Sequence, residues 1–113
     1  MTQHATLSEE RWARFSHDQQ ILMIANEMNR TSQRLGNADR GARRNGYERI
    51  LRLTDLTVAQ SERRLRRELL RWRDLVAELY IANTAEPELH RCAFRALLQL
   101  HPTAARQIPL LLP

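Results

Sequence analysis

The sequence lacks lysine entirely, and it contains a single cysteine, Cys92, and only three glycines among its 113 residues. A lone cysteine excludes a disulfide within the chain, so the fold must depend on packing, and we expect a reducing compartment. The longest uninterrupted apolar run covers residues 21–25, whereas a helix that spans a bilayer needs roughly 20 apolar residues. The first residues also lack the cationic and apolar pattern of a signal peptide. These absences predict a cytoplasmic protein.

Aromatic residues are scarce, at 5% of the chain, and no segment alternates β-branched or aromatic residues with polar ones. Strands favour such an alternation, so strands are not expected. A chain that is 42% hydrophobic and 27% charged has the composition of a globular protein, and its length suits one domain. We therefore predict a single all-α domain over residues 1–113, with a short N-terminal arm at 1–5 and an irregular C-terminal tail at 102–113.

The first predicted helix covers residues 7–35. Thr6 and Glu9 have the spacing of a capping box, in which each side chain binds a free backbone amide of the other residue. Gly36 is expected to end this helix, because glycine readily takes the left-handed conformation found at helix ends. Residues 36–46 contain all three glycines and are predicted to form a loop.

One stripe of apolar and small residues keeps its helical phase from residue 47 to residue 79, in steps of three and four. Either one long helix covers residues 47–82, or two helices meet near residues 54–57. We favour the break, because Thr54 and Thr57 are weak helix formers and Thr57 has the spacing of a second capping box. The predicted helices are therefore 44–54 and 57–82.

A last helix is predicted at residues 87–100. Pro87 suits a first helical position, where its missing amide hydrogen is not needed, and Pro102 follows the predicted end. The tail beyond it is apolar, and we predict that it is not helical around Pro109.

All eighteen basic residues are arginines, and with thirteen acidic residues they give a net charge of +5. The excess lies in residues 40–73, where eleven arginines and four acidic residues give a net charge of +7. Within this segment Arg63, Arg67 and Arg71 form a row at positions i, i+4 and i+8, with Arg64 beside it. Like charges at this spacing repel by about 0.2–0.5 kcal/mol per pair, so the row does not serve the stability of the helix.

The arginine row has two interpretations. In the first, the four arginines bind a nucleic-acid backbone with an affinity that falls steeply as salt increases. In the second, they pair with acidic residues of a neighbouring helix or subunit, such as Glu9, Glu10 or Asp74. No aromatic residue interleaves with the row, so base stacking has no platform.

His17 and Asn29 fall within the apolar sector of the first predicted helix. An unpaired buried polar group costs about 1–3 kcal/mol, so each of them should have a partner. They either line a pocket for a small molecule or a proton, or they are satisfied polar groups that fix the register of the helices. The sequence has no Glu-x-x-His pair, Gly-x-Ser-x-Gly elbow or glycine-rich phosphate loop. We predict no catalytic residue, metal or cofactor.

These patterns predict an antiparallel bundle of three to four helices that is completed by dimerisation. Several apolar positions lie outside the main stripes, and a subunit of this size cannot easily cover them all: Leu53, Leu56, Leu70, Ile81 and the tail at 108–112. A symmetric homodimer is the commonest solution. Our primary hypothesis is a non-catalytic, self-associating interaction or structural module. The alternatives are a nucleic-acid-binding module that uses the arginine row, and a ligand-binding or catalytic bundle centred on His17 and Asn29.

Overall fold

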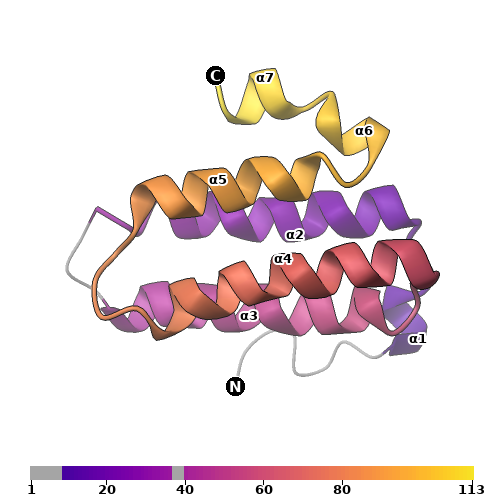
Figure 1. The fold of residues 1–113 in the computed structure, drawn as a ribbon, viewed down its shortest axis with the longest axis horizontal. Coiled ribbons are helices and arrows are strands. Elements are labelled where there is room, and N and C mark those ends of the chain that lie inside the picture. The colour runs from indigo at the N-terminus through magenta and orange to yellow at the C-terminus, as the bar shows by residue number, and fades with distance from the viewer. Residues whose placement is uncertain (1–8, 37–39) are drawn as a thin grey trace.

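Four long helices run back and forth along the molecule in the computed structural model, which describes residues 9–36 and 40–113 (Figure 1). Three short helices accompany them, one before the bundle and two after it, and the described residues contain no strand. The long helices are α2 (His17–Ser32), α3 (Arg40–Val58), α4 (Arg63–Ile81) and α5 (Pro87–Leu98). The short ones are α1 (Glu9–Trp12), α6 (Pro102–Ala105) and α7 (Ile108–Leu111). The prediction of an all-α helical bundle is confirmed.

The four long helices form a ring in which each packs against two others. α2 contacts α3 and α5, and α4 contacts the same two helices from the opposite corner (Figure 1). Because the connections between consecutive helices are short, each helix runs antiparallel to the next. This arrangement buries one side of every long helix and leaves the other side of α4 facing solvent.

The predicted first helix at 7–35 is wrong at its beginning, because the chain turns between α1 and α2. It is also wrong at its end, because α2 stops at Ser32 and Gly36 is not in the left-handed conformation. Ser16 caps α2, and Gln19 completes a capping box with it. The turn allows Trp12 to be fully buried, with its indole Nε1 donating to Thr57 Oγ1 at 2.9 Å. The Gln20 amide donates to the Trp12 carbonyl at 2.9 Å, so a carbonyl freed by the break is satisfied. The predicted arm at 1–5 and the predicted cap at position 6 lie outside the described residues.

The predicted loop at 36–46 is also wrong in its second half, since α3 already begins at Arg40. A β-carbon added at Gly46 would overlap the Thr31 side chain, so this glycine lets α2 and α3 approach closely. A glycine inside a helix costs about 1 kcal/mol relative to alanine, and here the close packing offsets that cost.

The predicted break between two helices exists, but it lies at residues 59–62 instead of 54–57. Thr54 and Thr57 remain inside α3, where both are buried and their hydroxyls donate to carbonyls one turn earlier, at 2.7 and 3.0 Å. Glu62 begins α4 by accepting from the backbone amides of Arg64 and Leu65 at 2.9 and 2.8 Å.

The C-terminal tail is partly helical, which corrects the prediction of an irregular segment at 102–113. Pro102 and Pro109 each stand in the first turn of a short helix, where a proline needs no amide hydrogen. Ala104 and Leu112 are buried against the bundle. α5 begins at Pro87 as predicted and ends two residues before the predicted 100.

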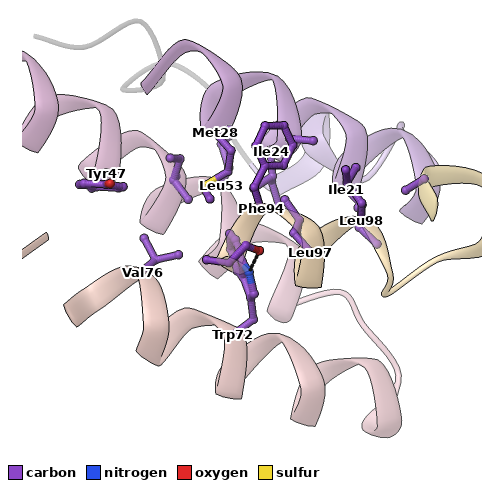
Figure 2. Packing of buried hydrophobic residues seen from close by; sticks show 14 of the residues in the cluster. Ile21, Ile24, Met28, Tyr47, Leu53, Trp72, Val76, Phe94, Leu97 and Leu98 are labelled. Atoms are coloured by element: carbon purple, nitrogen blue, oxygen red, sulfur yellow. Dashed lines mark hydrogen bonds between the residues drawn. The ribbon is translucent and has the colours of Figure 1, made fainter. Parts of the chain in front are cut away.

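One hydrophobic core joins the four long helices (Figure 2). Leu69, Trp72, Val76 and Leu79 of α4 are buried in or beside it, as the apolar stripe predicted. The Trp72 indole Nε1 donates to the Ala93 carbonyl at 2.7 Å and so ties α4 to α5 (Figure 2). In the part of the chain that the structure describes, no helix has the length and apolar character needed to cross a membrane.

Candidate interaction surface

The outer stripe of α4 is the set of positions opposite its buried side, spaced alternately by four and three residues. It consists of Arg63, Arg67, Leu70, Asp74, Ala77 and Ile81. Two of its apolar side chains are open to solvent, since Leu70 is 45% exposed and Ile81 is 73% exposed. The two stand eleven residues apart, about three helical turns, and therefore lie on the same side of the helix.

The structure brings together all four predicted arginines on the first three turns of α4. Arg63, Arg64, Arg67 and Arg71 are exposed, and with Glu62 and Glu68 they line one shallow hollow. Arg64 lies 4.0 Å from the Glu68 carboxylate, which is a distant and exposed ion pair. Glu62 is occupied in capping the helix, and the two backbone amides that it accepts lower the pKa of its carboxyl.

Three of these arginines have no ion pair or hydrogen bond in residues 9–36 and 40–113, namely Arg63, Arg67 and Arg71. The partners suggested by the sequence, Glu9, Glu10 and Asp74, form no ion pair with them in the described residues. These three side chains are therefore exposed and are not held in an ion pair, although Glu62 and Glu68 share the hollow with them.

The exposed face of α4 changes sign along its length. Arg63, Arg67 and Arg71 make its first half basic, whereas Asp74 and Glu78 are exposed on its second half and make it acidic. A polyanion laid along the whole helix would therefore meet repulsion beyond Arg71.

Several other arginines of the basic segment are engaged within the fold. Arg43 is buried, and its Nη2 atom donates to the Ala82 and Asn83 carbonyls at the end of α4, at 3.4 Å each. Three more join α3 to its neighbours: Arg49 with Glu27 at 3.1 Å, Arg73 with Asp55 at 2.6 Å, and Arg44 over the Tyr80 ring at 4.9 Å.

His17 and Asn29 are partly exposed, so the prediction that they are buried is wrong. They also line two different hollows. His17 lies beside Phe15, Gln20 and Gln60 near the turn between α1 and α2. Asn29 lies where the end of α2 meets α5 and α7, in a hollow of about 450 Å³. The structure therefore does not bring these two side chains into one site.

The buried histidine is His90, which the sequence interpretation missed. Its Nε2 lies 2.9 Å from the Met28 carbonyl and therefore donates, so Nδ1 accepts from the Tyr47 hydroxyl at 2.8 Å. Burial lowers the pKa of His90 and raises the pKa of Tyr47 to about 12, so both groups are neutral near pH 7. The signal was present in the sequence, since His90 precedes Phe94 and Leu97 at core spacing on α5.

Metal-ligating side chains do not cluster among the described residues, where no group of three His, Cys, Asp or Glu is suited to hold an ion. Comparison with known proteins also yields no match to a family model, a curated protein or a solved structure. The function must therefore be argued from the residues of this chain, and the outer stripe of α4 is the surface that they single out.

Proposed function

We propose that this protein is a non-catalytic interaction module that self-associates through the outer stripe of α4. The observation that carries the proposal is that two exposed apolar side chains, Leu70 and Ile81, lie on the same helix face as arginines that form no ion pair in the described residues. Apolar area removed from water stabilises a complex by roughly 25 cal/mol per Å². Arginines without partners gain from carboxylates supplied by a second molecule.

The burial of other apolar positions supports the choice of α4 as the proposed surface for association. Leu53 and Leu56 lay outside the predicted stripe, yet they are buried within the subunit. In the apolar tail Leu112 is buried and Ile108 and Leu111 are partly buried against the core, whereas Leu110 on α7 is 75% exposed. The exposed residues Leu70 and Ile81 therefore become the strongest support for self-association.

A cytoplasmic location is part of this proposal. Cys92 is exposed and is not in a disulfide, which suits a reducing compartment.

The test of self-association is the mass in solution across a range of protein concentrations. Light scattering or sedimentation should give a particle near twice 13.3 kDa at high micromolar concentration. Replacing Leu70 and Ile81 together by serine should raise the dissociation constant about tenfold or more, because apolar burial is lost. Leu110→Ser is the matched control, since Leu110 is as exposed as Ile81 but lies on α7. A wild-type protein that stays monomeric at these concentrations would contradict the proposal.

A second candidate function is nucleic-acid binding, which the three arginines without ion pairs favour. Contacts to phosphates would make binding independent of sequence and strongly dependent on salt. Changing Arg63, Arg64, Arg67 and Arg71 to glutamine should then abolish binding to random RNA or DNA and flatten the salt dependence. The matched control removes exposed arginines elsewhere, with Arg95→Gln and Arg106→Gln. Absence of binding by the wild-type protein at low salt would rule this candidate out.

A further inference from the structure

We infer that the two copies pack α4 against α4 in antiparallel orientation, with a twofold axis passing the helices at the level of Trp72. This inference rests on the self-association proposed above and specifies its geometry. The alternating spacing of the outer stripe is the spacing of side chains along a seam between two helices. A twofold axis is the commonest symmetry by which one surface binds itself.

The change of sign along α4 selects the antiparallel arrangement. In a parallel pair, Arg67 would face Arg67 of the second copy and Asp74 would face Asp74, so like charges would meet at both ends. In the antiparallel pair, the basic half of each stripe lies on the acidic half of the other. Juxtaposed like charges suppress an arrangement, whereas complementary charges fix orientation and register.

The axis position defines two symmetric sets of charge pairs. With the axis at the level of Trp72, Arg67 approaches Glu78 of the second copy, and Arg71 approaches Asp74 of the second copy. Each pair occurs twice, once on either side of the axis. The arginines that form no ion pair within one copy thus approach carboxylates of the second copy.

The same register also covers the exposed apolar side chains. The Leu70 side chains of the two copies lie on either side of the axis and pack together across it. Arg63 lays its aliphatic stem along Ile81 of the second copy while its guanidinium stays in water. The register therefore uses the apolar and the charged members of the outer stripe together.

Nothing in the described fold obstructs this approach. α4 packs mainly against α3 and α5, and α6 and α7 lie beyond α2 and α5 (Figure 1). An interface with one helix from each copy falls at the small end of specific interfaces, below about 1,200 Å² in total. We therefore expect a micromolar dissociation constant that rises with salt, because the charge pairs at its rim are screened.

Charge reversal tests the pairing directly. Arg67→Glu places a carboxylate opposite Glu78 of the second copy, and Glu78→Arg places a guanidinium opposite Arg67, in each case twice by symmetry. Each single change should raise the dissociation constant about tenfold or more, and the double variant should return to within about threefold of wild type. Sedimentation of the full chain at low salt measures all four proteins.

Two controls separate loss of the interface from loss of folding. Arg67→Glu places a carboxylate four residues from both Arg63 and Arg71, so the helix itself should become slightly more stable while the dimer weakens. Thermal unfolding of the monomer at low concentration checks this opposite response. Glu88→Arg on α5 is the matched reversal away from the stripe and should leave the dissociation constant unchanged.

The outcomes distinguish this inference from the function on which it rests. A wild-type monomer overturns both. If the wild type dimerises and neither single reversal weakens the dimer, self-association stands but the antiparallel α4 pairing is overturned. The pairing is also overturned if the double variant dimerises as weakly as the single variants. A monomer that binds random RNA through Arg67 overturns the inference and assigns the arginines to nucleic acid.

Discussion

The arginines of α3 and those on the outer stripe of α4 belong to one basic segment but have opposite environments. In α3, Arg43 is buried and Arg49 is held against Glu27, so these charges stabilise contacts within the fold. In α4, the Arg63 and Arg67 side chains are exposed and form no ion pair with the described residues, although Glu62 and Glu68 lie in the same hollow. The difference shows that the net charge of a segment says little about its function. The position of each guanidinium decides whether it serves the fold or is free to bind.

The largest expected effect on stability comes from removing an arginine that is engaged within the fold. Arg49→Ala takes from the buried Glu27 carboxylate a cation that lies 3.1 Å away, and Arg30, which also pairs with Glu27, is largely exposed. We expect the free energy of unfolding to fall by about 2 kcal/mol, because a buried charge loses compensation. Urea denaturation measures the change. Arg52→Ala is the control, since Arg52 is exposed on the same helix, and equal losses in the two variants would refute the distinction.

An intermediate effect on stability is expected from a fall in pH, which should act through the buried His90 and not through the outer stripe of α4. Burial lowers the pKa of His90 below its usual 6.5 in the folded state, so the unfolded chain binds this proton first as pH falls. The contribution of His90 to stability is complete above pH 6.5 and is lost below it, by up to about 1.4 kcal/mol per pH unit. Urea denaturation at pH 7 and pH 5.5 should show the loss. In His90→Gln the part of this stability loss that is due to His90 should disappear. An equal loss of stability between pH 7 and pH 5.5 in the variant and the wild type would contradict the role given to His90.

The smallest expected effect on stability comes from removing an exposed arginine of the outer stripe. Arg67→Ala abolishes two i, i+4 repulsions, with Arg63 and Arg71, and removes no ion pair within the subunit. The monomer should gain about 0.2–0.5 kcal/mol or stay unchanged in stability. Thermal unfolding at low protein concentration measures this. A loss of more than about 1 kcal/mol would mean that Arg67 serves the fold after all.

Most of the helical architecture was predictable because apolar periodicity records which side of each helix is buried. The stripe of Leu69, Trp72 and Val76 is buried as expected, and Pro87 begins α5. The ends of the helices were less predictable. A glycine or a threonine shifts local helix stability by about 1 kcal/mol or less, and a single well-packed contact exceeds this. Gly46 inside α3 is such a case, because the absence of a side chain at this position allows Thr31 of α2 to pack closely against α3.

The candidate surface was found only in part from the sequence. The arginine row was visible, because i, i+4 repulsion between cations needs an explanation outside the helix. The sequence did not reveal that Arg43 and Arg49 are engaged while Arg63 and Arg67 are free, since that depends on residues of other helices. It also placed His17 in the apolar sector, whereas His17 is the first residue of α2 and is partly exposed. It missed His90, although Phe94 and Leu97 follow His90 at core spacing on α5.

The sequence by itself determined that this protein is helical, that its long helices have apolar sides, and that its excess of positive charge lies in residues 40–73. These properties depend on near neighbours along the chain, at spacings set by the geometry of a helix. The tertiary structure alone decided which apolar side chains remain open and which arginines lack partners in the described fold. Each of these is settled by contacts between residues far apart in the chain, whose energies outweigh local preferences.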